Sequence, residues 1–431
     1  MDDRARAPEL LAEVYRCPGE ARPIDRATHL GRLATFYPPC RQCDHREETH
    51  NLTSLQVRHW AEIERRGASE PRFTGEALQN ESRHDVDREV ARQFAAALAA
   101  VLWRDPARVA APAVLVGSDG HWTSAEPMAA ACEALQWAGC RTLEAGAVTS
   151  ASLAAAAHQA NADAALVVGN STGEPHATAL KAWGKTGRPW SLPGGLDAIA
   201  RMYGSRVDRP RRHGGHLQRA DARSVYLAPL EPMFHGLRPL RFVLDTRSEP
   251  FLRQLHELGA RAACEVLRPE SSETSASGAE RPFVLRRLEI VGRRVVEHAT
   301  HFGLWISGDG EACRLVDERG KSVPGEALFM MLAKYICGQK PGATLIVERE
   351  IHSSLARELK LLDARTLRAD STRQATSEAI ERTGAVFGGG TSGRFWYAGQ
   401  PAAPDALMTL ALVLTILSQS DRPLSEVLDA A

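Results

Sequence analysis

The sequence predicts an α/β protein with three consecutive domains, preceded by a small segment that contains several Cys and His residues. A pattern of strand, helix and strand occurs three times along the chain. Two stretches typical of linkers separate the repeats: Ser205 to Arg223 is rich in Arg, His and Gly, and Ser271 to Gly278 has low complexity. The length of 431 residues also suits about three domains.

The first repeat begins with an amphipathic helix, because apolar residues recur at about four-residue spacing from Val86 to Val101. An apolar strand follows at 113–116. Thr123 and Glu126 then form the pattern of a capping box, which predicts a helix that runs to Gly139. The remaining elements of this repeat are a strand at 140–143, a helix at 153–161 and an apolar strand at 165–168.

The second and third repeats follow the same order. The second has strands at 241–244 and 261–267 around a helix at 250–258. The third has strands at 344–347 and 365–368 around a helix at 354–362. Three copies of this unit predict three α/β domains rather than one large sheet.

Composition excludes several classes of protein. Lys and Arg together number 53, as do Asp and Glu, so no global basic field argues for nucleic acid. The basic stretch at 205–223 lacks aromatic residues that could stack on bases. No signal peptide is visible, and the longest apolar run, Ala406 to Leu417, is shorter than the roughly 20 residues of a membrane span. The eight dispersed cysteines suit a reducing compartment, which predicts a cytoplasmic protein without membrane or nucleic-acid partners.

Residues 1–70 hold a candidate zinc site. Cys40 and Cys43 form a C-x-x-C knuckle, with Cys17 upstream and His45 just downstream. Three thiolates and one imidazole can close a tetrahedral zinc site and could stabilise a segment with little core of its own. The alternative is a set of reduced cysteines without a metal in a small helical appendage.

A second candidate site lies where the strand at 165–168 ends. The loop that follows is built from small and hydroxyl residues, including Ser171 and Thr172, and Lys181 lies shortly after it. An exposed serine at the end of a strand, near a lysine, could hold a phosphate or act as a nucleophile. Taken singly, however, such a serine is most often a turn residue and such a lysine a surface residue.

Four loops, in order, resemble the motifs of the α-D-phosphohexomutase family, the phosphoglucomutases and phosphomannomutases. The resemblance covers roughly residues 73 to 431. Gly117-Ser118-Asp119-Gly120-His121 with Thr123-Ser124 is similar to the family's R-D-x-R stretch, and Asn170-Ser171-Thr172 with Leu180-Lys181 is similar to its phosphoserine loop. The family's metal loop resembles Gly308-Asp309-Gly310-Glu311-Ala312-Cys313. Its sugar loop resembles Gly388-Gly389-Gly390-Thr391-Ser392-Gly393-Arg394.

The resemblance implies a fold of phosphohexomutase-like α/β domains with mixed sheets, and it implies reversible phosphoryl transfer between a phosphoserine and a phosphosugar. Ser171 and Lys181 would be the catalytic residues. A Mg²⁺ ion would be bound by Ser171, Ser307, Asp309 and Glu311. Substrate-binding residues would be His121, Ser392 and Arg394.

The loops also depart from the family pattern. The family's three metal-loop aspartates fall at Ser307, Asp309 and Glu311, so Mg²⁺ binding is expected to be weak or lost. The arginine that ends that motif is Ala312, and the glutamate of the sugar loop is Gly390. Further upstream, a family arginine is replaced by Gln79. No counterpart of the family's fourth domain is found before Ala431.

The resemblance divides the chain into residues 1–70, domain 1 at 71–204, domain 2 at 224–298 and domain 3 at 299–431. The altered loops predict a catalytically degenerate family member with a binding or regulatory role. Two alternatives stay open at this point. One is an active phosphosugar enzyme that uses Ser171 and Mg²⁺, completed by a partner chain; the other is an interaction module acting through the N-terminal zinc segment. A protein partner or a homo-oligomer is compatible with each of them.

Overall fold

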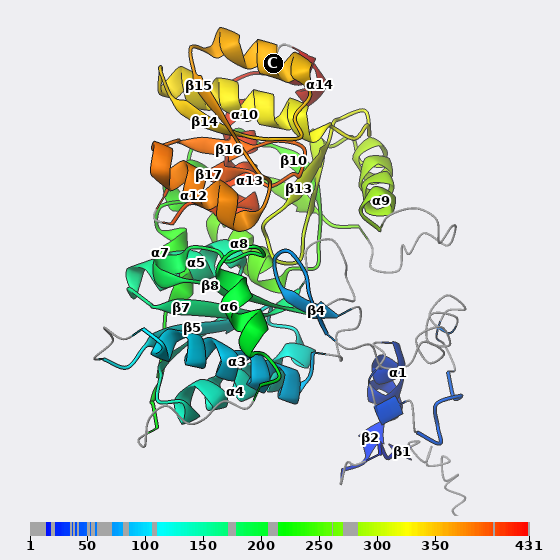
Figure 1. Ribbon diagram of the computed structural model, residues 1–431. Helices are drawn as coiled ribbons and strands as arrows, with labels where there is room; N and C mark the ends of the chain where they lie inside the picture. Colours follow the sequence, from blue (N-terminus) through cyan, green and yellow to red (C-terminus); the bar gives the residue numbers. More distant parts are fainter. Residues whose placement is uncertain are drawn as a thin grey trace, which may run out of the picture.

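The computed structural model of the protein describes residues 14–18, 22–34, 37, 39–40, 43–49, 52, 57, 71–80, 86–105, 110–170, 178–205, 214–260, 262–269, 283–399 and 401–429. Within these ranges the chain forms three mixed α/β sheets in sequence order, together with a two-stranded sheet near the N-terminus. The predicted α/β class is confirmed. Figure 1 draws the first unit below and the third unit above it, with β10 and β13 of the second unit beside the third.

The first unit is a seven-stranded sheet with the order β3-β4-β8-β7-β5-β6-β9. Strands β5, β6, β7 and β9 are parallel, while β8, β4 and β3 pair antiparallel. Its strands are β3 (Arg72–Phe73), β4 (Leu78–Asn80), β5 (Ala113–Ser118), β6 (Arg141–Ala147), β7 (Ala164–Asn170), β8 (Thr178–Trp183) and β9 (Leu217–Arg219). Its helices are α3 (Arg88–Trp103), α4 (Trp122–Trp137), α5 (Ser150–Gln159), α6 (Gly195–Met202) and the short η2 (Lys185–Gly187).

The ends of these helices follow from local chemistry. Asp87 caps α3, since its carboxylate accepts hydrogen bonds from the backbone N–H groups of Glu89 and Val90. The expected capping box at Thr123 is wrong, because α4 begins one residue earlier and His121 is its N-cap. The Nδ1 atom of His121 accepts from the backbone of Thr123. A capping box does occur at α5, where Thr149 and Ser152 satisfy each other's backbone N–H groups.

The second unit is a four-stranded sheet with the order β11-β10-β12-β13, in which only β13 is antiparallel. Its strands are β10 (Arg241–Thr246), β11 (Glu265–Leu267), β12 (Phe302–Ile306) and β13 (Cys313–Val316). Its helices are α7 (Ala222–Leu227), η3 (Glu231–Phe234), α8 (Glu249–Gly259) and α9 (Phe283–Glu297). Strand β12 pairs with β10, and β13 pairs with β12, so the sheet of the second unit includes strands beyond residue 298.

The third unit is a five-stranded sheet with the order β15-β14-β16-β17-β18, parallel up to β16 and antiparallel beyond it. Its strands are β14 (Thr344–Glu348), β15 (Arg365–Ala369), β16 (Phe387–Gly389), β17 (Trp396–Tyr397) and β18 (Ala403–Pro404). Its helices are α10 (Gly325–Gln339), α11 (Ser353–Leu359), η4 (Lys360–Leu362), α12 (Arg373–Thr383), α13 (Ala406–Ser418) and α14 (Leu424–Asp429).

The three sheets share one topology. In each sheet one strand (β5, β10 or β14) lies between two parallel strands that follow it in the chain (β6 and β7, β11 and β12, or β15 and β16). The next strand (β8, β13 or β17) returns antiparallel beside the last of these. The return is a hairpin: β7 to β8, β12 to β13, and β16 to β17. The loops that resemble the family's phosphoserine, metal and sugar loops therefore occupy the same position in their sheets, namely the hairpin connection to the antiparallel strand.

The units are packed together by apolar cores and by buried polar contacts. One apolar core runs through the second and third units, from Phe242 and Phe302 to Phe387 and the helix α13. A buried pair strengthens this packing: the hydroxyl of Tyr226 on α7 donates to the carboxylate of Asp405, at 2.8 Å from Oδ1. Asp405 in turn caps α13 by accepting from the backbone of Leu407 and Met408.

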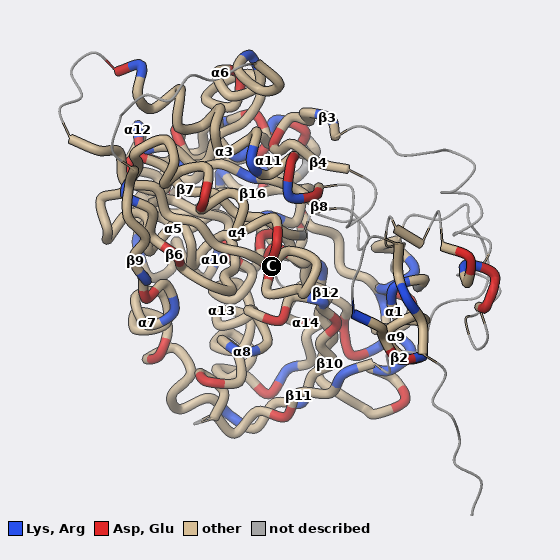
Figure 2. Tube along the Cα trace, turned by 90° about the horizontal axis from the view of Figure 1, so that it is seen from below, with Lys and Arg blue, Asp and Glu red and all other residues tan. Residues whose placement is uncertain are grey.

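Charges are mixed over the surface, as the balanced composition requires. Blue and red segments alternate along the trace in Figure 2.

Among the helices of the described part of the chain, none is long and apolar enough to cross a bilayer. The N-terminal segment contains β1 (Val14–Tyr15), β2 (Ile24–Asp25) and α1 (Arg26–Ala34).

We expect Tyr226→Phe to lower the free energy of unfolding by about 1.5–3 kcal/mol, because it removes a donor from a buried carboxylate. Chemical denaturation followed by circular dichroism would measure the change. Tyr335→Phe, a partly buried tyrosine against the same core, is the matched control and should cost less. Equal losses in the two variants would contradict a specific role for the Tyr226–Asp405 contact.

Candidate functional site

The hairpin loops of the three sheets define the candidate site. The β7–β8 loop at 171–177 lies outside the described residues, so the roles predicted for Ser171 stay predictions. The β12–β13 loop at 307–312 and the β16–β17 loop at 390–395 are described and lie against each other. Ala312 and Arg394 form an isolated antiparallel bridge, and the backbone N–H of Cys313 donates to the carbonyl of Gly393 at 2.9 Å.

Lys181 is a buried lysine in the middle of β8. It lies opposite Val167 of β7, between Leu180 and Ala182, and only 3% of its side chain is exposed. Its ammonium forms a salt bridge with Asp309 Oδ2 and lies 3.5 Å from Glu311 Oε1. A buried ammonium is costly unless it is paired with opposite charge, and these two carboxylates provide that charge. The structure therefore brings Lys181 together with two predicted metal ligands.

Internal hydrogen bonds fix the shape of the 307–312 loop. Ser307 Oγ donates to Asp309 Oδ1, which also accepts from the backbone N–H of Glu311 at 3.1 Å. Gly310 has a φ of +75°, and a Cβ at this position would lie 3.1 Å from the side chain of Thr149. A side chain there would therefore be strained as well as crowded.

Backbone contacts to both neighbouring units also hold this loop. The N–H of Ser150 at the start of α5 donates to the carbonyl of Asp309 at 3.0 Å. The N–H of Ala406 at the start of α13 donates to the carbonyl of Gly310 at 3.1 Å. The loop is thereby fixed between the first and third units.

Two arginines from the third unit form ion pairs with the carboxylate of Glu311. Arg373, the first residue of α12, is fully buried, with Nε 3.1 Å from Glu311 Oε1 and its guanidinium 4.4 Å from the ring of Trp183. Arg394 lies on the other side, with Nε 3.3 Å from Glu311 Oε2. Within the described residues, Arg373 and Glu311 make ion pairs without well-aligned hydrogen bonds. Charge and a ring contact therefore hold Arg373 in place.

Glu76 adds a third carboxylate to the site. Arg394 binds it in a bidentate pair, with NH1 to Oε1 at 2.6 Å and NH2 to Oε2 at 2.5 Å. Burial alone raises the pKa of Glu76, but Arg394, then Arg373 and Lys181, outweigh this effect and hold the pKa below its usual value. Burial likewise lowers the pKa of Arg394, while Glu311 and Glu76 outweigh it and raise that pKa.

Six side chains thus form what we call the charged cluster. It consists of Lys181, Arg373, Arg394, Glu76, Asp309 and Glu311. Three are cations and three are carboxylates, so their formal charges sum to zero. They come from the first, second and third units, and the cluster therefore lies where all three meet. The sequence analysis found four of its members and missed Glu76 and Arg373.

The 390–395 loop is held by a carboxylate that the sequence analysis also missed. Glu348, at the end of β14, is buried and accepts from the backbone N–H of Ser392 at 2.8 Å and from its hydroxyl. A Cβ on Gly390 would lie 2.7 Å from Glu348 Oε2. The side chain of Glu348 therefore fills the space beside the glycine that replaces the family's glutamate. Ser392, predicted to bind substrate, is engaged by Glu348 in this structure.

His121 lies at the beginning of α4, where its Nδ1 is 2.7 Å from the hydroxyl of Thr123. The loop that carries it packs beside the end of β7, since the N–H of Asp119 donates to the carbonyl of Val168 at 3.1 Å. A Cβ on Gly169 would come within 2.6 Å of the Asp119 side chain. The predicted substrate residue His121 thus lies at the carboxyl end of the parallel strands. Its side chain also caps α4 by accepting a hydrogen bond from the backbone N–H of Thr123.

Of the residues predicted to hold Mg²⁺, Ser307, Asp309 and Glu311 are described, and these three do not fit the ion in this arrangement. Mg²⁺ requires oxygen ligands in near-octahedral geometry at about 2.0–2.1 Å. The carboxylate oxygens of Asp309 and Glu311 instead face the cations Lys181, Arg373 and Arg394, or donors of their own loop. Ser307 is occupied as well, because its oxygen accepts from the N–H of Ala312 at 2.9 Å.

The expected zinc site receives no support. No group of three or more Cys, His, Asp or Glu in the described ranges is arranged to hold a metal. Cys17, Cys40 and Cys43 are buried, and the Sγ atom of Cys17 accepts from Arg32 NH1 at 2.9 Å. His45 Nδ1 lies 2.7 Å from a carboxylate oxygen of Glu48.

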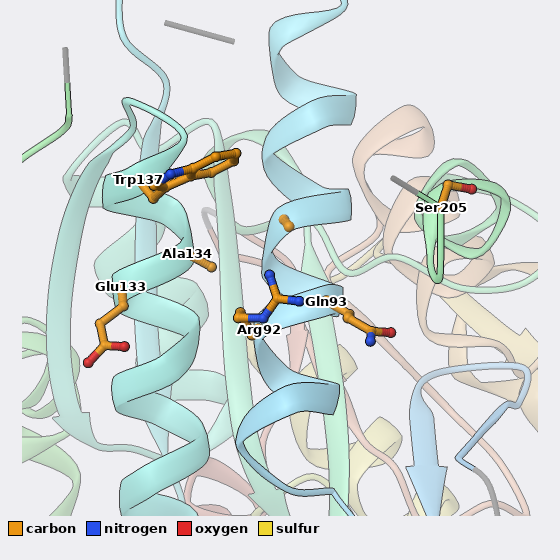
Figure 3. Close-up of a pocket in the computed structure, with 7 residues that line it drawn as sticks. Arg92, Gln93, Glu133, Ala134, Trp137 and Ser205 are labelled. Carbon is orange, nitrogen blue, oxygen red and sulfur yellow. The ribbon is translucent and has the colours of Figure 1, made fainter. Parts of the chain in front are cut away.

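A hollow of about 420 Å³ lies away from the charged cluster, on the outer face of α3 and α4. Figure 3 shows Arg92 and Gln93 projecting from α3, and Glu133 and Trp137 from α4. None of the predicted site residues lines it. The chemistry of the candidate site is therefore confined to the junction of the three units.

Comparison with known proteins supports the resemblance. A family model described as phosphoglucomutase/phosphomannomutase α/β/α domain I matches residues 73–204, and the model for domain III matches residues 324–431. The chain is 30% identical over 177 residues to phosphoglucosamine mutase from Heliobacterium modesticaldum, covering 40% of this chain and 37% of that protein. It is 26% identical over 309 residues to phosphoglucosamine mutase from Sorangium cellulosum, covering 68% and 63%. The chain thus spans less than two thirds of the length of these curated relatives.

Solved structures share the fold. A phosphoglucomutase/phosphomannomutase family protein from Burkholderia thailandensis superposes with a TM-score of 0.69 at 21% identity, covering 82% of this chain and 78% of that chain. Parafusin, a phosphoglucomutase from Paramecium, superposes with a TM-score of 0.61 at 12% identity, covering 84% and 75%. At these identities the likeness concerns the fold alone.

We expect Glu76→Gln to lower the free energy of unfolding at pH 7 by about 1.5–3 kcal/mol, because it removes the charged partner of Arg394. The folded pKa of Glu76 lies below its ordinary value of 4.5, so its contribution is fully present above pH 4.5 and is lost as the pH falls through the folded pKa. The stability of the variant should therefore fall less steeply below pH 4.5. Unfolding curves between pH 3 and pH 7 would measure this, with exposed Glu126→Gln as the control. Parallel pH curves for Glu76→Gln and the native protein would contradict the pairing.

We expect Gly390→Ala to cost about 1–3 kcal/mol of stability, because the new methyl group would clash with Glu348. The cost should shrink when Glu348 is also changed to Ala, and a double-mutant cycle measured by denaturation gives the coupling. Gly338→Ala, in open space within α10, is the control and should be neutral or stabilising. An equal cost on both backgrounds would show that Glu348 does not occupy the space.

Proposed function

The chain belongs to the phosphoglucomutase/phosphomannomutase family, and we propose that it is a member without mutase turnover that has a binding or regulatory role. The observation that carries this proposal is the charged cluster. Lys181, the predicted catalytic cation, is buried in salt bridges with Asp309 and Glu311, the predicted metal ligands. Among the described residues, the cation and the two carboxylates expected to act near a phosphate are thus engaged by one another.

Phosphoryl transfer depends on positive charge placed around the transferred group. Here the three cations of the charged cluster are matched by three carboxylates, so the cluster has no excess positive charge. Lys181 could assist a transfer only after its ammonium had left Asp309, which would leave a buried carboxylate without its counter-ion. Breaking a buried ion pair in this way typically costs about 3–5 kcal/mol. This cost would add directly to the barrier of the reaction.

The relatives suggest which ligand to test first. Those named above are phosphoglucosamine mutases, so we propose a hexosamine phosphate as the ligand class of the site. The loop of Ser392 and the α4 N-terminus with His121 carry hydroxyl and imidazole groups of the kind that bind sugar hydroxyls. Ligand binding would then regulate a partner or report the level of a phosphosugar, with no product released.

An active enzyme is the second candidate, and one observation favours it. Lys181, Asp309 and Glu311 come together at ion-pair distance, as a working site would require. A phosphate on Ser171, or a partner chain, could supply the charge that opens the cluster. In this case the charged cluster would be a resting state of a phosphosugar mutase.

We expect purified protein to show no interconversion of glucosamine 6-phosphate and glucosamine 1-phosphate above background, with or without Mg²⁺ and a bisphosphate activator. A coupled assay or phosphorus NMR would measure it. Mass spectrometry of the purified protein should find Ser171 without phosphate. Turnover that disappears in Ser171→Ala would overturn this proposal and establish the second candidate, with Ser205→Ala, an exposed serine elsewhere, as the control.

A further inference from the structure

The carboxylates of the 307–312 loop already have counter-ions, which the first and third units supply. We propose that the ammonium of Lys181, assisted by Arg373 and Arg394, replaces a divalent cation at this loop, so that the folded protein does not bind Mg²⁺ there. The inference rests on the proposed function only for the assignment of the loop to this family. It concerns what the loop binds, which is a separate question from whether the protein turns over a substrate.

The oxygens of the two carboxylates are already in use. Asp309 Oδ1 accepts from the Ser307 hydroxyl and from the N–H of Glu311, and Oδ2 faces Lys181. Glu311 Oε1 lies 3.5 Å from Lys181 Nζ and 3.1 Å from Arg373 Nε, and Oε2 lies 3.3 Å from Arg394 Nε. A metal ion bound to these oxygens would lie among three fixed positive charges, which would repel it in a poorly hydrated site.

The cations are fixed in place by the fold. Lys181 is in the interior of β8 between paired strands, so its backbone cannot swing away from the loop. Arg373 packs on Trp183, and its neighbour Gln374 is bound to the first unit, accepting from the N–H of Ser191 at 3.1 Å and of Gly195 at 3.0 Å. Arg394 is held by its bidentate pair with Glu76.

The arrangement also links the three units without a metal. Lys181 and Glu76 belong to the first unit, Asp309 and Glu311 to the second, and Arg373 and Arg394 to the third.

We expect the thermal stability of the native protein to be unchanged by Mg²⁺ or by a chelator. Binding of a divalent ion should appear when the ammonium is removed.

The test compares native protein with Lys181→Met, which keeps an unbranched side chain, shorter by one atom, but removes its charge. Titrations with MgCl₂ and MnCl₂, followed by calorimetry and by the melting temperature, report binding directly. We expect no binding heat and no melting shift for the native protein. Lys181→Met should bind Mn²⁺ at least tenfold more tightly than the native protein does. Lys185→Met, an exposed lysine beyond β8, should behave as the native protein.

Two outcomes overturn the inference. The first is native protein that binds Mg²⁺ or Mn²⁺ with a melting shift that disappears in Asp309→Asn. The second is a folded Lys181→Met variant, by circular dichroism, that gains no affinity for Mn²⁺. If Lys181→Met does not fold, the native and Asp309→Asn titrations decide alone. An active native enzyme that binds no metal would overturn the proposed function but not this inference, and an inactive enzyme that binds Mg²⁺ would do the reverse.

Discussion

The buried salt bridges of Lys181 with Asp309 and Glu311 are the constraint on which the rest of the site depends. A lysine in the interior of a strand between apolar neighbours needs a compensating charge, and the loop of the next unit provides it in two carboxylates. That loop is fixed in turn by backbone hydrogen bonds to α5 and α13. Arg373 and Arg394 then neutralise Glu311, and Glu76 neutralises Arg394. Each charged side chain in this series thus lies beside the opposite charge of the preceding one.

The repeated topology explains why these loops can meet at all. Each unit returns its fourth strand beside its third, so each unit presents one hairpin loop at the carboxyl end of its parallel strands. The described loops of the second and third units come into contact, and Ala312 pairs with Arg394 across the boundary. A site built in this way depends on the relative placement of three units. Small changes in any loop therefore alter its chemistry without altering the fold.

Sequence patterns identified the loops but not all of their partners. Lys181, Asp309, Glu311 and Arg394 lie in recognisable motifs, and all four belong to the charged cluster. Glu76 lies in a stretch that was considered only for Gln79, and Arg373 follows the helix cap Thr372 without any motif of its own. Glu348 ends an apolar strand, and nothing local indicates that its carboxylate fills the space beside Gly390. These residues act through partners far away in the chain, which periodicity and spacing cannot reveal.

The sequence by itself determined the α/β class, the repeated strand and helix order, and the loops in which chemistry would be found. Apolar periodicity and glycine-rich turns are local properties, so they can be read without a structure. Only the tertiary structure decided that Asp309 and Glu311, two of the predicted metal ligands, face a lysine and two arginines. The physical reason is that the state of a buried charge depends on which opposite charge the packing of distant segments brings to it.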